Sequence, residues 1–87
     1  MATKYAIVFT PAAKRDLNAL PRTILRRVDA KIQSLRENPR PQNMKKLRGR
    51  EGFLRVRVGD YRIVYQVADD RLVVLVVRIG HRREVYR

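Results

Sequence analysis

The sequence contains no cysteine and a single histidine, which excludes disulfide bonds and thiolate metal sites and leaves too few ligands for a histidine-based one. It also lacks an apolar run of membrane-spanning length. The N-terminus lacks the apolar region of a secretory signal, because the segment from Ala6 to Phe9 is stopped by Pro11. We therefore expect a cytoplasmic protein that uses no metal ion or cofactor and does not enter a membrane.

Acidic residues are scarce as well: eight Asp and Glu stand against 21 Lys and Arg, which gives a formal net charge of +13. Self-repulsion of this size opposes a compact fold, so we expect a polyanionic partner, with nucleic acid favoured over an acidic protein. Most of the basic residues are arginine, whose planar guanidinium can hold a phosphate through two hydrogen bonds. The composition therefore favours phosphate recognition.

The length allows one hydrophobic core, so residues 1–87 are predicted to form a single domain. A β-branched and aromatic run from Lys4 to Phe9 predicts a first strand. Thr10 and Pro11 then suit the N-cap and the first position of a short helix that ends near Leu20.

A second helix is predicted to begin after Pro21, because apolar residues then recur at helical spacing. These residues are Ile24, Leu25, Val28, Ile32 and Leu35. Asn38 suits a left-handed C-cap, and the proline that follows it prevents continuation of the helix. Residues 39–46 show no periodicity and are predicted to form a loop.

The second half of the chain reads as β-structure. Residues 53–58 and 61–67 alternate in polarity around Gly59-Asp60, which predicts a hairpin with a two-residue, glycine-first turn. After Asp69-Asp70, residues 72–79 are apolar on both faces, which is typical of a central strand. The element order predicts an α+β fold with an N-terminal strand, two helices and a three-stranded antiparallel meander, the helices packing on one face of the sheet.

This hairpin fixes which residues share a face. Val58 pairs with Tyr61, and Arg57 then lies directly opposite Arg62. One face is apolar and suited to the helices; it comprises Leu54, Val56, Val58, Tyr61, Ile63 and Tyr65. The other face bears Arg55, Arg57 and Arg62, although like charges opposite each other destabilise a strand pair. We expect an anion to bind there.

A turn at Asp69-Asp70 is predicted to bring Gly80 back beside Gly59. The tail would then emerge next to the Arg57/Arg62 pair, and it contains His81, Arg82, Arg83 and Tyr86. The prediction is a patch at one end of the sheet where guanidinium groups, an imidazole and a phenol converge.

Three motifs now support a family resemblance. They are Lys46-Leu47-Arg48-Gly49, the run Tyr61-Arg62-Ile63-Val64-Tyr65-Gln66-Val67, and the ending Arg78-Ile79-Gly80-His81-Arg82-Arg83-Glu84-Val85-Tyr86. Together they closely resemble the RelE toxins of toxin–antitoxin systems, over essentially the whole chain. The resemblance implies a ribosome-dependent endoribonuclease that cuts mRNA in the ribosomal A site without a metal, using the 2′-hydroxyl of the substrate as nucleophile. It also implies a RelB-like antitoxin that wraps and silences the toxin.

The resemblance assigns roles to individual residues. Arg62 would bind the scissile phosphate, and Arg82 and Tyr86 correspond to the arginine and tyrosine of the tail motif. The best-studied members carry two lysines where this chain has Arg55 and Arg57. This departure matters because a lysine can lose its proton and act as a base, whereas an arginine effectively cannot.

The chemistry of the remaining residues leaves two candidates for proton transfer. Arginines around Tyr86 would lower its pKa, and His81 is the one side chain with an ordinary pKa near neutrality. We rank Tyr86 first, because the family uses that position, and keep His81 as its competitor. The other cations of the motifs are predicted to bind RNA phosphates: Arg55, Arg57, Arg83, Lys46 and Arg48.

Two other functions are open at this stage. A ParE-like toxin of the same fold would inhibit DNA gyrase by protein contact, without nuclease chemistry. A plain basic module would bind nucleic acid without cleaving it, with an affinity that falls steeply as salt rises. The convergence of Arg62, Arg82 and Tyr86 favours the nuclease.

Overall fold

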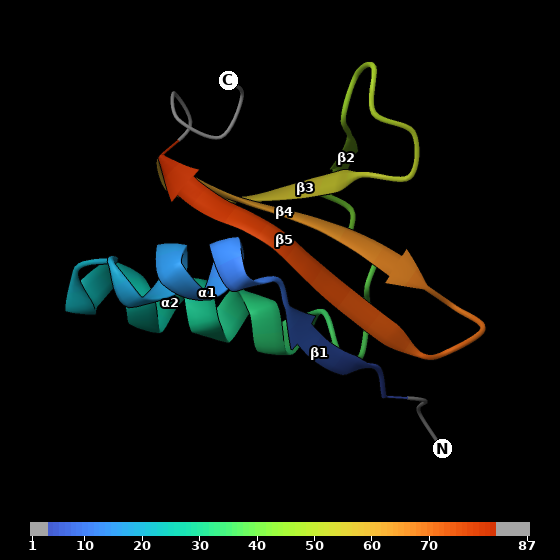
Figure 1. Ribbon diagram of the computed structural model, residues 1–87, viewed down its shortest axis with the longest axis horizontal. Helices are drawn as coiled ribbons and strands as arrows, with labels where there is room; N and C mark the ends of the chain where they lie inside the picture. Colours follow the sequence, from blue (N-terminus) through green and yellow to red (C-terminus); the bar gives the residue numbers. More distant parts are fainter. Residues whose placement is uncertain (1–3, 82–87) are drawn as a thin grey trace.

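The computed structural model describes residues 4–81; residues 1–3 and 82–87 lie outside the described part of the chain (Figure 1). Two helices pack on one side of a single five-stranded sheet (Figure 1). In chain order the elements are β1 (Ala6–Phe9), α1 (Pro11–Asn18), α2 (Arg22–Ser34), β2 (Lys45–Lys46), β3 (Leu54–Val58), β4 (Tyr61–Ala68) and β5 (Val73–His81). No helix among the described residues is long and apolar enough to cross a membrane. The predicted α+β class is confirmed.

Helix α1 begins where the sequence predicted. The Thr10 hydroxyl accepts a hydrogen bond from the Ala13 amide at 3.0 Å, and Pro11 occupies the first helical position, where its missing amide hydrogen costs nothing. The same hydroxyl donates to the Val77 carbonyl at 2.8 Å. One side chain therefore caps α1 and also ties its start to strand β5.

Helix α2 ends differently from the prediction. It stops at Ser34, and Asn38 has no left-handed conformation, because Leu72 is the only non-glycine residue with positive φ in the described chain. The amides of Leu35, Arg36 and Glu37 each bond to the carbonyl three residues earlier. This tightened final turn satisfies the last carbonyls, so a left-handed cap is not needed.

The predicted meander of β3, β4 and β5 is present, and one further strand flanks it on each side. The strand order is β1-β5-β4-β3-β2, with β1 parallel to β5, so β5 is an interior strand as predicted and β4 is the middle one. The prediction of a loop throughout residues 39–46 was wrong at its end, because Lys45 and Lys46 pair with β3 as a two-residue strand. Two residues are too few to produce an alternating sequence pattern.

The core lies between the helices and the covered face of the sheet, which we define by Leu54, Val56, Val58, Ile63 and Tyr65. All five are buried, and they pack against Ala13, Val28, Ile32 and Leu35 from the helical layer. The Tyr65 hydroxyl donates to the Pro39 carbonyl at 2.7 Å, and burial raises the pKa of Tyr65 to about 12. The predicted apolar face is confirmed.

The β3–β4 hairpin has the predicted register. Gly59 adopts a left-handed φ of 59°, as a glycine-first turn requires. Val58 pairs with Tyr61, and Arg57 pairs with Arg62. This turn therefore fixes which side chains face the helices and which face away from them.

Candidate functional site

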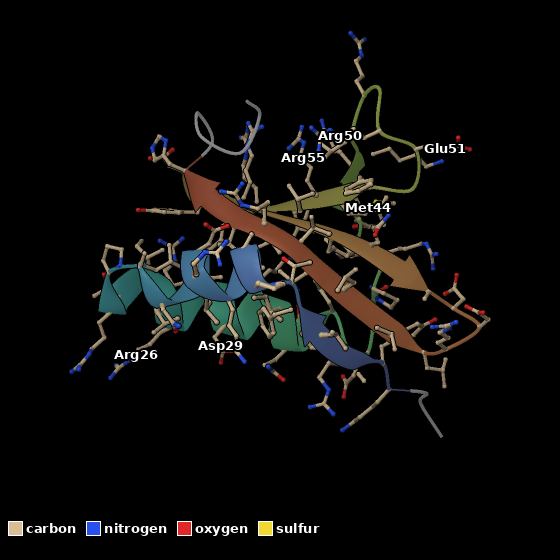
Figure 2. The ribbon with its side chains drawn as sticks, viewed as in Figure 1. Arg26, Asp29, Met44, Arg50, Glu51 and Arg55 are labelled. Carbon is tan, nitrogen blue, oxygen red and sulfur yellow. The ribbon has the colours of Figure 1, made fainter. Side chains whose placement is uncertain are left out.

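The side of the sheet opposite the helices carries a row of cations. Arg55 and Arg57 alternate with buried valines along β3, and Arg62 lies directly across from Arg57 on β4. In Figure 2 the Arg55 side chain rises from β3 on the side away from both helices. We call this side the basic face and define it by Arg55, Arg57, Arg62 and Lys45, whose placement is described below.

Arg62 is the most enclosed of these cations, with a relative exposure of 9%. It sits on β4, with Arg57 opposite it on β3 and Gly80 opposite it on β5. A guanidinium keeps its charge even when it is buried, and charge–charge interactions are stronger where water is excluded. Arg62 can therefore act as a fixed positive group toward an anion.

Strand β2 adds a cation that the sequence did not reveal. Lys45 pairs with Arg55 across β2 and β3, so the two side chains share the basic face. No sequence signal could have shown this, because β2 is two residues long. The next residue, Lys46, pairs with Leu54 and therefore points to the other side of the sheet. Lys46 was predicted to bind RNA, but the structure does not bring it to the arginines.

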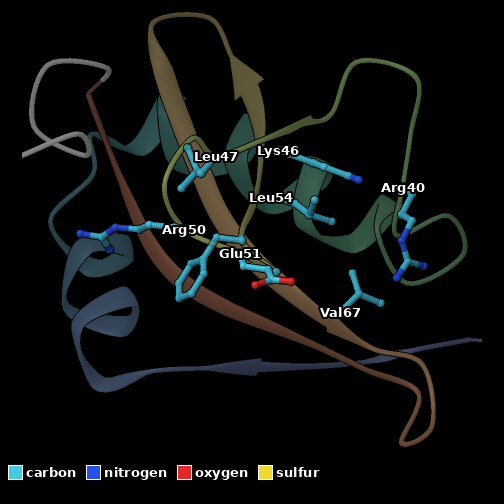
Figure 3. Close-up of a pocket in the computed structure, with 9 residues that line it drawn as sticks. Arg40, Lys46, Leu47, Arg50, Glu51, Leu54 and Val67 are labelled. Atoms are coloured by element: carbon cyan, nitrogen blue, oxygen red, sulfur yellow. The ribbon is translucent and has the colours of Figure 1, made fainter.

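Lys46 instead lines a cavity of about 450 Å³ beside the β2–β3 loop. Figure 3 shows Arg40 and Lys46 on one side of this cavity, whereas the Arg50 side chain extends in the opposite direction. Its lining also includes Glu51, Phe53 and Leu54. Arg48, also predicted to bind RNA, is exposed in the same loop.

His81 lies at the predicted end of the sheet but on the other face. It pairs with Tyr61, with ring centroids 5.7 Å apart and planes at 78°, and alternation places both on the helical side. With Leu20 and Pro21 from the corner between the helices, the two rings line a cavity of about 420 Å³. The structure therefore separates His81 from Arg62, and its acid–base role stays a prediction.

The predicted register of Gly80 with Gly59 was wrong, because Gly80 pairs with Arg62. The β4–β5 connection spans residues 69–72, twice the predicted turn, since Ala68 pairs with Val73. A bulge then shifts the register between Val64 and Tyr65. Arg82, Arg83 and Tyr86 lie outside the described residues, so their convergence on Arg62 stays a prediction.

Several acidic side chains are engaged elsewhere. Asp69 accepts hydrogen bonds from Arg40 at 2.8 and 3.1 Å and from the Tyr5 hydroxyl at 2.7 Å. These bonds, with Arg40 the larger contributor, lower the pKa of Asp69 to about 2. Asp16 of α1 pairs with Arg78 of β5 at 2.7 Å. In the described chain, no group of three or more His, Cys, Asp and Glu side chains could hold a metal ion.

The basic face has the chemistry of a phosphate site. Arg57 and Arg62 present two permanent positive charges from adjacent strands, and a phosphodiester would relieve their mutual repulsion. Fixed guanidinium groups can also stabilise the extra negative charge of a pentacoordinate phosphorane. They cannot transfer protons at neutral pH, so cleavage would need an acid–base group from another part of the chain.

Comparison with known proteins gives concordant results. Residues 7–86 match the family model described as ParE toxin of the type II toxin–antitoxin system parDE. Toxin RelG of Mycobacterium tuberculosis is 33% identical over 84 residues, which cover 95% of this chain and 97% of the relative. The mRNA interferase toxin RelE of Escherichia coli is 34% identical over 86 residues, covering 94% of this chain and 90% of the relative.

Solved structures agree with the sequence relatives. A chain in the toxin–antitoxin complex RelBE2 from Mycobacterium tuberculosis superposes with a TM-score of 0.81 at 34% identity, covering 97% of this chain and 98% of that one. A chain in the intact RelBE complex of Escherichia coli gives a TM-score of 0.78 at 31% identity, covering 88% and 95%. The similarity therefore extends over nearly the whole chain in each case.

Proposed function

Because this chain belongs to the RelE/ParE family of type II toxin–antitoxin toxins, we propose that it is a RelE-type toxin that cleaves mRNA in the ribosomal A site. The observation that carries the proposal is the Arg57/Arg62 pair, two cations held opposite each other on the basic face. This chain is 34% identical to the mRNA interferase toxin RelE of Escherichia coli, and this similarity supports RNA as the substrate. Because its proposed target is the translating ribosome, we propose a cytoplasmic location.

The proposed reaction uses the RNA's own 2′-hydroxyl. This oxygen gives up its proton and attacks the adjacent phosphorus, and the 5′-oxygen of the next nucleotide leaves and takes up a proton. The products are a 2′,3′-cyclic phosphate and a free 5′-hydroxyl. Arg62 stabilises the negative charge on the phosphorane oxygens, since its guanidinium is positive throughout the reaction.

Proton transfer is assigned to the tail. Tyr86 is the proposed acid–base group, with Arg82 and Arg83 as cations that lower its pKa and hold the substrate. Arg55 and Arg57 stand where the best-studied members of the family have lysines, so here they can bind phosphate but cannot act as bases. The departure makes the phenol of Tyr86 more important in this chain.

Metal independence follows from this assignment. The charges that a metal would stabilise are met by guanidinium groups, and the nucleophile needs no metal-bound water. Cleavage on ribosomes stabilised by polyamine should therefore persist in excess chelator and should leave a 2′,3′-cyclic phosphate or its hydrolysed product.

The proposed partners are a RelB-like antitoxin and the translating ribosome. A formal net charge of +13 suits both an acidic antitoxin and ribosomal RNA. The RelBE complexes with which this fold superposes support the antitoxin. The antitoxin should cover or distort the basic face, because access to Arg62 is needed for cleavage.

The experiment that tests this function maps mRNA ends after incubation with programmed ribosomes, with naked mRNA as control. We expect cuts in the A-site codon on ribosomes and little cleavage of naked mRNA. A 5′-phosphate product that disappears on chelation would indicate metal-activated water and would remove the proposed mechanism.

A second candidate is inhibition of DNA gyrase by protein contact, because the family model that matches residues 7–86 is that of the ParE toxin. A supercoiling assay with purified gyrase tests it directly. Inhibition of gyrase together with intact mRNA on ribosomes would replace the nuclease with this function.

A further inference from the structure

Lys45 occupies a position on the basic face that none of the motifs assigns. It lies at the sheet edge in β2 and pairs with Arg55 of β3. Residues directly opposite in an antiparallel pair have Cβ atoms about 5 Å apart and project to the same side. Two positive side chains are therefore held as close neighbours on the side away from the helices, where Figure 2 shows Arg55.

Lys45 lies directly opposite a second cation, Arg55. Like charges placed opposite each other destabilise a strand pair. Lys45 is exposed, and in residues 4–81 the ion pairs are Lys4–Glu37, Arg40–Asp69 and Arg78–Asp16, so no acidic partner from this region neutralises it. The positive charge of Lys45 is therefore open to an external anion at this edge of the sheet.

Lys45 is linked to Arg62 of the proposed site by a row of neighbouring residues on the basic face. Arg62 lies across from Arg57, Arg55 follows two residues away on the same face of β3, and Lys45 lies across from Arg55. Two strand spacings and two residues along a strand give a diagonal on the order of 12 Å from Arg62 to Lys45. This row crosses β4, β3 and β2 on one face.

We propose that Lys45 binds a backbone phosphate of the substrate strand, so that single-stranded RNA crosses the sheet diagonally from Arg62 to the β2 edge. The inference rests on the proposed function and adds the direction in which the RNA runs. A lysine suits this position because it is a compact point charge for a phosphate and needs no fixed orientation.

Lys46 provides a matched control within the same strand. It has the same side chain and is also exposed, but it pairs with Leu54 and lines the cavity on the other side. The two lysines contribute equally to net charge. A difference in RNA affinity between Lys45→Ala and Lys46→Ala would therefore come from the face on which each lysine lies, and not from the overall charge.

The test measures binding of a short single-stranded oligoribonucleotide with 2′-O-methyl groups, which lacks the nucleophile and cannot be cut. Fluorescence anisotropy over a range of salt gives affinity and its salt dependence. Lys45→Ala should weaken binding roughly threefold or more and reduce the log–log salt slope by about 0.7, the value for one phosphate contact on a single strand. Lys46→Ala should match the wild type.

A charge reversal gives an independent reading. Lys45→Glu places an acid opposite Arg55, so the melting temperature should rise by about 1–4 °C. RNA binding should fall further than in Lys45→Ala. A variant that folds better yet binds RNA less cannot be explained by damage to the fold.

Three outcomes would overturn the inference. Equal losses of oligonucleotide affinity in Lys45→Ala and Lys46→Ala would show that only the net charge matters. A loss of ribosome affinity with unchanged oligonucleotide binding would assign Lys45 to the ribosome. A lower melting temperature in Lys45→Glu would contradict the Lys45–Arg55 pairing. Because these readings use binding and melting, they are separate from the wild-type cleavage assay that tests the proposed function.

Discussion

Arg62 and Ile63 are neighbours in β4, yet they lie on opposite faces of the sheet and serve different purposes. Ile63 is fully buried against the helical layer, whereas Arg62 faces the other side opposite another arginine. The same alternation separates Val56 from Arg55 and Arg57 on β3. Each strand therefore contributes alternate residues to stability and to a cationic surface that opposes stability.

The division of labour between the two faces explains why the chain tolerates so much positive charge. The covered face supplies the hydrophobic burial that holds the domain together, and the basic face can then keep cations in positions that no fold would select for stability. Substitutions on the covered face should consequently change the free energy of unfolding, whereas substitutions on the basic face should change RNA binding and cleavage.

The largest expected effect concerns the proton-transfer group. Tyr86→Phe keeps an aromatic ring for stacking and deletes the hydroxyl, so it should slow cleavage roughly 10²–10⁴-fold with ribosome binding almost intact. Single-turnover cleavage on programmed ribosomes measures this. His81 lies on the helical side, so His81→Gln should retain most activity. An inactive His81→Gln beside an active Tyr86→Phe would reverse our ranking of the two.

A substitution in the core should lower the free energy of unfolding and leave the cleavage rate unchanged. Ile63→Ala leaves a cavity under the helices and should lower the free energy of unfolding by about 2–5 kcal/mol. Denaturant unfolding measures the loss. At a temperature where the variant remains folded, its single-turnover cleavage rate should stay near that of wild type. A folded Ile63→Ala that has lost cleavage would show that the two faces are not independent.

The smallest expected effect lies at the Asp69 network, away from both faces. The folded-state pKa of Asp69 is lowered from 3.8 to about 2, so its contribution is present above pH 4 and is lost as pH falls toward 2. Asp69→Asn should therefore have a lower melting temperature than wild type at pH 7. The two melting temperatures should converge as the pH falls toward 2. Thermal melts across this range measure it; a constant difference would assign the effect to something other than ionisation.

The features that follow from adjacent residues could be predicted from the sequence. Thr10-Pro11 determines the start of α1, and Gly59-Asp60 determines the β3–β4 register and hence the Arg57–Arg62 pair. These signals are local, because a cap or a tight turn constrains the few residues around it.

The features that depend on distant parts of the chain could not be predicted. Lys45 joins the basic face only because β2 pairs with β3, and a two-residue strand has no pattern. His81 lies on the helical side because the bulge at Val64/Tyr65 shifts the β4–β5 register by one residue. A shift of one residue exchanges the faces, so small errors in register relocate a candidate site residue.

The role of Arg62 as the phosphate-stabilising cation is tested by the single-turnover cleavage rate of Arg62→Ala at saturating toxin on programmed ribosomes. Arg26→Ala is the matched control, because Arg26 is an exposed arginine on α2 (Figure 2). We predict a loss on the order of 10²–10³ for Arg62→Ala, as for removal of a transition-state donor, with a folded protein and a nearly unchanged rate for Arg26→Ala. A folded Arg62→Ala that cuts the A-site codon at the wild-type rate would contradict the account.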